Sequence, residues 1–287
     1  MAEGTPVERA DAPVPPPHPP APAAARAPDV WQIRGQLSGR RYFVIALAGF
    51  AFTLGFWWAL SVSGWVNPLF LPDPPTVLHR FSQWLLHGSL LADTRISVLR
   101  VTVAFVISSV MAVPLGLYIG AFAPVQAFFE PLMEFARYLP AVAFVPLVLL
   151  WVGIGEGSKI AVIWIGTFFQ QVLLVAEDVR RVPVTQIEAA QTMGASRGEI
   201  LKLVLFKSAL PGIVDTLRIT LGWAWTYLVV AELVASNSGL GFAILQAQRF
   251  LQTDKIFVGI LMIGVIGLVM DQLLRFMHRR AFPWLYH

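Results

Sequence analysis

Hydrophobic positions follow one another in long runs along this chain. Six runs, at about 42–63, 97–120, 130–152, 159–178, 214–235 and 256–276, approach or exceed the ~20 residues that cross a bilayer core. A membrane barrel would instead show segments of about ten residues with alternating apolar and polar positions, which this sequence lacks. The pattern predicts an all-α, polytopic membrane protein with about six transmembrane helices.

The third run differs from the others because it contains Pro140 and Pro146 and begins with the charged stretch EPLMEFARYLP. Proline inside a span is tolerated where protein or a watery cavity covers the freed backbone groups. We therefore expect this span to be kinked or broken. On the outer side, two longer connections are expected at 64–96 and 236–255, and SGLGFAIL in the second is expected to form a short re-entrant helix.

The cations beside the spans predict the orientation. With both termini inside, most of them lie on the cytoplasmic side, where Lys and Arg are in excess in membrane proteins. That arrangement leaves outside only a smaller set: Arg80, Arg95, Lys159, Arg249 and Lys255.

Composition agrees with a membrane protein. The chain is 56% hydrophobic and only 13% charged, against roughly 25% charged in soluble domains. Because the cations cluster beside the apolar runs, the basic balance does not indicate a nucleic-acid partner. Residues 1–29 are rich in Pro and Ala and are expected to be a disordered tail, so we divide the chain into a tail with a basic flank (1–40) and a membrane domain (41–287).

One polar stretch, at about 181–211, lies between two predicted spans. Thr185 to Glu188 and Ser196 to Glu199 each fit a capping box at a helix start, and Gly194 stands where a helix would end in a left-handed residue. Pro211 is expected to limit the second helix. The stretch predicts a cytoplasmic helical hairpin, for which docking of a soluble partner and rest on lipid headgroups are both open.

This stretch resembles a known family signature, which consists of Glu188, Ala189, Ala190, Gly194 and Val204 at fixed spacing. It is similar to the EAA signature of permease subunits of binding-protein-dependent ABC importers. In that family the loop carries the coupling helix that sits in a groove of the cytoplasmic ATPase. One departure is Phe206-Lys207 in place of the usual Leu-Pro, which leaves room for a longer second helix.

The resemblance extends from residue 68 to the end. LPDPPTVL, EFARYLPAVAFVPLVLLWVGIGEGSKI and ELVASNSGLGF look like segments of the nitrate, sulfonate and taurine branch. The resemblance implies a MetI-like core in the bacterial inner membrane, a second permease copy (a homodimer), an ABC ATPase dimer that holds ATP and Mg, and a periplasmic or lipid-anchored binding protein. No cofactor is expected in this chain, and no ATP hydrolysis, because no GxxxxGK[ST] loop occurs. Nitrate, sulfonates or taurine are the expected solutes, with bicarbonate, cyanate, aromatic acids or pyrimidine precursors as alternatives.

Polar groups within spans are candidates for the solute pathway because their burial in a membrane is costly. The candidates, to which one tryptophan is added, are Arg137, Tyr138, Gln170, Gln171, Trp225 and Glu232. Each has a structural alternative: Glu232 could pair with Arg137, and the glutamines could bond neighbouring helices. Near the inner end, we expect Asp271 to pair with Arg275 and His278 to be solvated.

Two other classes of function would require sequence features of their own. An intramembrane enzyme would need paired catalytic groups at helical spacing, and neither HExxH nor a comparable array occurs. A stand-alone secondary carrier often shows inverted repeats and buried carboxylates that couple ions, and neither is evident. Co-isolation with an ATPase subunit would separate the carrier from an ABC permease.

Overall fold

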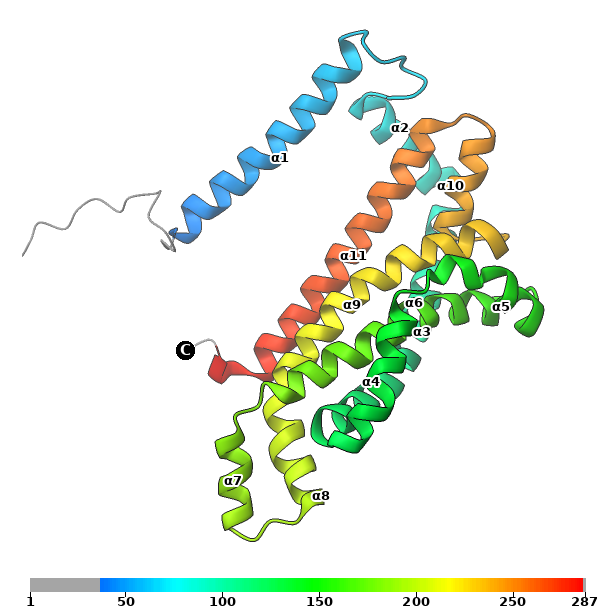
Figure 1. Ribbon diagram of the computed structural model, residues 1–287. Helices are drawn as coiled ribbons and strands as arrows, with labels where there is room; N and C mark the ends of the chain where they lie inside the picture. The colour runs from blue at the N-terminus through cyan, green and yellow to red at the C-terminus, as the bar shows by residue number, and fades with distance from the viewer. Residues whose placement is uncertain (1–36, 286–287) are drawn as a thin grey trace, which may run out of the picture. The chain divides into compact units, whose positions relative to one another are not determined.

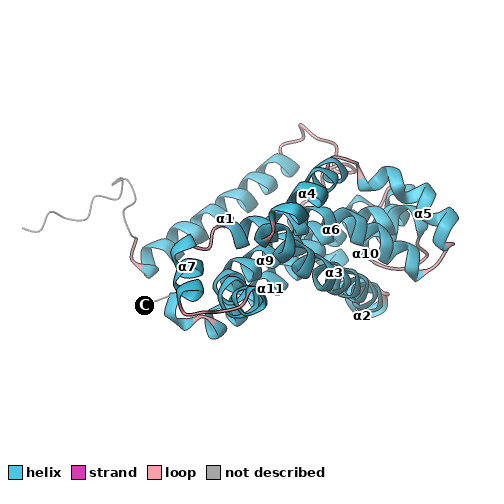
Figure 2. Ribbon diagram, turned by 60° about the horizontal axis from the view of Figure 1, so that its bottom comes forward, coloured by secondary structure: helices cyan, strands magenta, loops and turns pink. Residues whose placement is uncertain are grey.

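The computed structural model describes residues 37–285, and within these residues all regular elements are helical (Figure 2). The expected disordered tail at 1–29 lies outside the described residues. Two compact units are separated, with the boundary between Leu54 and Gly55 inside helix α1 (Gly39–Val62). The second unit carries all other elements.

The second unit contains the remaining elements (Figure 1). They are α2 (Pro74–His87), α3 (Leu90–Ala121), α4 (Ala123–Arg137), a 3₁₀ turn (Ala141–Phe144), α5 (Val145–Val152), α6 (Glu156–Arg180), α7 (Val184–Thr192), α8 (Arg197–Glu199), a π-helical turn (Ile200–Leu205), α9 (Phe206–Ala235), α10 (Leu240–Arg249), α11 (Thr253–Ala281) and a 3₁₀ turn (Pro283–Leu285).

Four of the described helices, α1, α3, α6 and α11, are long and apolar enough to cross a membrane, and the bent pair α4 and α5 makes a fifth candidate. The pair is bent by 89°, which confirms the break expected in the third span. The predicted fifth span at 214–235 lies within α9, which has the length but is not among the apolar candidates. Its residues Asp215, Arg218 and Glu232 carry charge and are paired within the protein.

Helix α6 lies at the centre of the second unit, packed against α3 and α9. Gly116 and Gly120 on α3 allow the closest approach, because a Cβ on either glycine would lie 2.7 Å from a backbone oxygen of α6. Small residues four positions apart are a recurrent way for membrane helices to pack closely. The buried core that α3, α5, α6 and α9 share includes Val101, Ile163 and Leu228.

Helix α9 connects two separate regions of the second unit. It begins at the hairpin of α7 and α8 and ends next to α10, so that the hairpin and α10 lie at opposite ends of this helix (Figure 1). Helix α10 confirms the short helix expected in SGLGFAIL. Helix α3 begins at Leu90, earlier than the predicted 97. The charged residues of its first turns interrupt the apolar pattern there, but in the structure they contact other elements.

Candidate functional site

The first arm of the hairpin is α7, which begins directly after Pro183. Pro183 has φ −59° and serves as the residue before the helix, without a side-chain cap. The predicted capping box at Thr185 is therefore wrong: the fixed φ of proline suits a helix start, so that Thr185 lies inside the first turn. Glu188 and Ala189 are exposed on this arm.

The turn between the arms confirms the expected left-handed residue. Gly194 has φ +80°, and its amide donates to the carbonyl of Gln191 at 2.9 Å, while the amide of Ala195 donates to the carbonyl of Ala190 at 3.0 Å. These two bonds form a Schellman motif, which satisfies the last carbonyls of a helix. The turn is thus fixed by the backbone.

The second arm starts with the capping box predicted at Ser196. The Ser196 hydroxyl accepts from the amide of Glu199, and the Ser196 amide donates to the Glu199 carboxylate at 2.8 Å. Hydrogen bonds from the hydroxyl and the amide of Ser196 hold the pKa of Glu199 below its usual range, since they favour the charged form. The second helix therefore has a defined start, directly after Ser196.

The second arm does not end where it was expected to end. The backbone stays helical from Arg197 through the π-helical turn Ile200–Leu205 into α9, and Pro211 lies inside α9. A proline lacks the N–H that would bond the carbonyl four residues earlier and often kinks or ends a helix, but here the helix continues past it. Nε2 of His278 on α11 lies 3.2 Å from the carbonyl oxygen of Pro211. His278 is buried in this contact, so the prediction that it is solvated is wrong.

The two arms pack together through the small and apolar residues of the signature. Ala190 is 5% exposed and belongs to a buried cluster with Ile200, Leu201 and Leu205, against which Val204 packs. A hydrogen bond of 2.8 Å from the Ser208 hydroxyl to the Gln186 side-chain oxygen also joins the arms. The signature thus has two parts: Ala190, Gly194 and Val204 build the hairpin, whereas Glu188 and Ala189 face outward.

A second polar centre lies at the opposite end of α9. The Arg100 guanidinium donates to Glu232 at 2.7 Å and to Glu156 at 2.6 and 2.7 Å. Glu232 also accepts from the Ser97 hydroxyl at 2.8 Å and the Gly241 amide at 2.7 Å. These bonds tie α3, α6 and α9 to the start of α10.

The partner of Glu232 is therefore Arg100, and the pair with Arg137 that the sequence left open as an alternative is not formed. Arg137 instead ends α4, and its Nη2 donates to the Tyr138 hydroxyl at 3.2 Å while its guanidinium lies 4.9 Å from the centre of that ring. Among residues 37–285, Arg137 makes no ion pair with a carboxylate.

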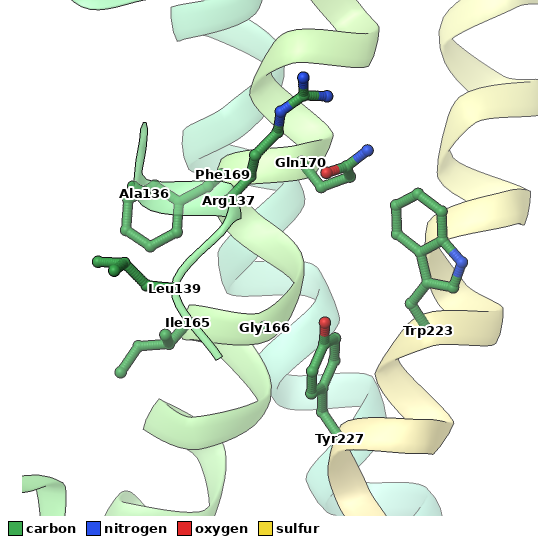
Figure 3. Close-up of a pocket in the computed structure, with 9 residues that line it drawn as sticks. All are labelled: Ala136, Arg137, Leu139, Ile165, Gly166, Phe169, Gln170, Trp223 and Tyr227. Carbon is green, nitrogen blue, oxygen red and sulfur yellow. The ribbon is translucent and has the colours of Figure 1, made fainter. Parts of the chain in front are cut away.

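Arg137 and Gln170 line a cavity of about 240 Å³ between α4, α6 and α9 (Figure 3). Trp223 and Tyr227 of α9 form the facing wall. Tyr227 lies against Gly166 of α6, where a Cβ would be 2.4 Å from the tyrosine ring. The cavity thus joins two predicted pathway residues to an aromatic wall.

The other predicted pathway residues lie elsewhere. Gln171 is fully buried between α3, α6 and α9, where its amide bonds Ser108 at 2.7 Å, Ser109 at 3.0 Å and Thr220 at 3.1 Å. This bears out the alternative of a helix-bonding glutamine. Trp225 is 4% exposed within the core and borders a different cavity, between α9 and α11.

Three residues of these two centres were missed from the sequence. Arg100 interrupts an apolar run, and the rule that intramembrane charge is functional or paired would have identified it. Glu156 stands at the start of α6, beside a predicted span. Tyr227 carried no local signal, because its place against Gly166 depends on how α6 and α9 pack.

In the second half of α11, the predicted pair of Asp271 and Arg275 is confirmed at 3.1 Å. Asp271 also pairs with Arg218 of α9 at 2.9 Å. This contact and that of His278 join α11 to the first half of α9.

Comparison with known proteins identifies the group to which the chain is related. Residues 112–283 match the family described as binding-protein-dependent transport system inner membrane component. The taurine transport system permease protein of Escherichia coli is 34% identical over 249 residues, which cover 85% of this chain and 90% of that protein. A putative aliphatic sulfonates transport permease protein of Bacillus subtilis is 32% identical, over 82% of this chain and 85% of that protein. The bicarbonate transport system permease protein of Synechococcus elongatus is 28% identical, over 82% and 88%.

Solved structures agree on the fold. A chain of a bacterial alginate ABC transporter aligns with a TM-score of 0.58 at 14% identity, over 84% of this chain and 91% of that chain. A chain of the MetNI methionine ABC transporter, in an inward-facing form, aligns with a TM-score of 0.54 at 22% identity, over 64% and 95%. Given this fold, the family match and the identities above, the chain belongs to the inner-membrane permease components of binding-protein-dependent ABC importers, in the branch that includes the taurine, sulfonate and bicarbonate permeases.

Proposed function

We propose that residues 182–205, which we call the coupling hairpin, dock an ABC ATPase dimer, and that this chain passes a small anion across the inner membrane. The continuous helix from the hairpin to the far end of α9 is the observation that carries the proposal. At ~1.5 Å per residue, the helical path from Arg197 to Ala235 is roughly 55–60 Å long, enough to cross a bilayer core of about 30 Å.

Such a path can transmit force because its backbone is helical throughout. The Schellman turn and the capping box fix the hairpin at one end, and the bond of Glu232 to Arg100 fixes α9 at the other. Movement of an ATPase against the hairpin would therefore be carried along α9 to the end where it is tied to α3 and α6.

The exposed residues of the hairpin support docking. Glu188 and Ala189 present a charge beside a small side chain, which lets a partner approach closely, and Met193 at the tip is 80% exposed. An exposed methionine is adaptable and common at binding surfaces. ATP and Mg would then be held by the partner, and this chain would need no cofactor.

The proposed solute is a small anion such as taurine, another sulfonate, nitrate or bicarbonate. The matched relatives are permeases for taurine, aliphatic sulfonates and bicarbonate. In the described residues, the cavity of Arg137 has no carboxylate in its wall. We further propose that two copies of the chain assemble, and that a periplasmic or lipid-anchored binding protein delivers the solute.

The coupling hairpin and both termini are proposed to be cytoplasmic. The contact of His278 with Pro211 supports this for the C-terminus, because it brings the end of α11 to the start of α9, near the hairpin. The excess of cations on that side supports the same orientation.

The test is the ATPase activity of the complex, co-purified in lipid and titrated with its binding protein loaded with taurine, an alkanesulfonate, nitrate or bicarbonate. Stimulation by one loaded form, and not by the unloaded protein, would support the permease role and name the solute. If the chain co-purified with no ATPase, or imported a solute without one, a stand-alone carrier would replace the proposal.

A further inference from the structure

The polar side chains that line the cavity between α4, α6 and α9 all carry hydrogen-bond donors. Its polar side chains are Arg137, Gln170, Trp223 and Tyr227, and each of them carries an N–H or O–H donor. In the described residues no carboxylate lines it. A wall rich in donors and without a negative charge favours a ligand that accepts hydrogen bonds and carries negative charge.

The donors of Gln170 and Arg137 make few hydrogen bonds within the protein. Gln170 makes no side-chain hydrogen bond within residues 37–285, whereas its neighbour Gln171 makes three. Arg137 donates only to the hydroxyl of the adjacent Tyr138. Two other arginines that border cavities, Arg80 and Arg218, are both paired with aspartates.

The cavity is also small and partly aromatic. Pockets for drug-sized ligands measure about 300–1,000 Å³, and this cavity measures about 240 Å³. Figure 3 shows Arg137 beside Gln170, with Trp223 and Tyr227 across from them. Because Tyr227 lies directly against Gly166, a larger residue at position 166 would push its ring into a new position.

From this arrangement we propose that the cavity is a subsite for a small oxyanion, a sulfonate or a similarly compact anion with several acceptor oxygens. Arg137 supplies the charge, Gln170 and Trp223 donate to the acceptor oxygens, and Tyr227 with Gly166 sets the width. The proposal of this subsite rests on the proposed function. With such a subsite, the permease would select the solute by charge and size, in addition to the selection by the binding protein.

The experiment uses the complete permease–ATPase complex in lipid nanodiscs, without binding protein. Methanesulfonate is the probe, and dimethyl sulfone is its uncharged analogue of similar size. Binding is followed by ligand-observed NMR. We expect methanesulfonate to bind more tightly than dimethyl sulfone, and Arg137→Gln to weaken it by about ten-fold or more, the loss of one charge-assisted hydrogen bond.

Three further variants give the test its controls. Arg137→Lys keeps the charge and should retain most of the binding, whereas Gly166→Ala should weaken it by moving Tyr227. Arg95→Gln removes an exposed arginine that makes no ion pair in the described residues, and should leave binding unchanged. If Arg137→Gln disturbs folding, the binding of methanesulfonate to Gln170→Ala is the deciding measurement. Gln170 makes no side-chain hydrogen bond within residues 37–285, so this substitution should not disturb folding.

Lipid phosphate could offer the same chemistry as a free oxyanion. The titration is therefore repeated in nanodiscs of neutral and of anionic lipid: competition by anionic lipid alone, with no methanesulfonate binding in neutral lipid, would mean a headgroup site and overturn the proposal. Equal binding of methanesulfonate to the wild-type and Arg137→Gln complexes would overturn it as well. Neither result touches the proposed function, which depends on ATPase stimulation by the loaded binding protein.

Discussion

Arg100 of α3 and Glu232 of α9 form an ion pair of 2.7 Å, and their side chains are only 1% and 0% exposed. The pair is embedded in further bonds, from Ser97 and the Gly241 amide to Glu232 and from Arg100 to Glu156. It joins the end of α9 that lies farthest from the coupling hairpin to α3 and α10. At this end of α9, ion pairs and hydrogen bonds hold the helices of the second unit together. At the other end, the apolar packing of the hairpin does so.

Replacing Arg100 by Met should destabilise the protein strongly. Removal of one partner leaves Glu232 buried without its counter-charge, which typically costs about 3–5 kcal/mol. The measurement is the unfolding midpoint of the purified complex in detergent. The double variant Arg100→Met with Glu232→Met should recover part of the loss, because no unpaired charge then remains; a double variant as unstable as the sum of the single variants would contradict this account.

Gly194→Val should weaken the coupling hairpin without disturbing the membrane helices. A Cβ at this position meets no atom within 4 Å, so the cost arises from φ +80° and is roughly 1–2 kcal/mol for a residue with a side chain. We expect less ATPase subunit to co-purify and solute uptake to fall. Gly198→Ala is the matched control, because this glycine is equally open, has no positive φ and lies in α8. Equal retention of the ATPase by both variants would argue against a role of the turn.

Glu188→Lys should reduce association with the ATPase or uncouple hydrolysis from import. Glu188 is exposed, so the substitution leaves folding intact and acts on the partner surface. Glu188→Gln separates charge from shape, since it keeps the size and removes the charge. The ratio of solute imported to ATP hydrolysed measures coupling, and a wild-type ratio in Glu188→Lys would rule out a coupling role for this residue.

The capping box of Ser196 and Glu199 should depend on pH. Because the folded-state pKa of Glu199 is lowered, its stabilisation is complete above about pH 4.3, the ordinary value, and is lost as the pH falls through the lowered pKa. Hydrogen exchange of peptides covering the second arm, followed from pH 6 downwards, should show opening in that window. Glu199→Gln keeps a capping partner that does not titrate, so its exchange should show no such step.

The sequence allowed most of the fold to be predicted because apolar runs and capping residues are local signals. The break of the third span followed from Pro140 and Pro146, and the left-handed turn from Gly194. Pairings between distant elements could not be predicted this way. Arg100 is 132 positions from Glu232, and only the packing of α3 against α9 brings the two together. From the sequence alone, Arg137 was therefore given as a possible partner and Arg100 was missed.

The start and end of the hairpin helices show the same limit. Two positions fitted a capping box, but only Ser196 caps a helix, because Pro183 starts α7 before Thr185 can act. Pro211 was expected to end the second arm, yet it lies inside α9, because a proline can be accommodated within a helix that is packed against other elements. In both cases the local signal alone did not determine where the helix starts or ends.

Gln170 and Gln171 are adjacent on α6, and they should respond in opposite ways to the same substitution. Gln171→Leu removes the partner of Ser108, Ser109 and Thr220 and leaves buried hydroxyl groups with fewer bonds, which costs about 1–3 kcal/mol. Gln170→Leu removes a side chain that makes no hydrogen bond within residues 37–285 and should leave the free energy of unfolding within about 0.5 kcal/mol of wild type, as most substitutions away from such networks do. In proteoliposomes, however, Gln170→Leu should lower solute uptake, since it takes a donor out of the cavity. The two variants, measured side by side for stability and for transport, therefore separate the structural glutamine from the one that we propose contacts the solute. A loss of stability in Gln170→Leu, or unchanged uptake, would place both residues in the structural class.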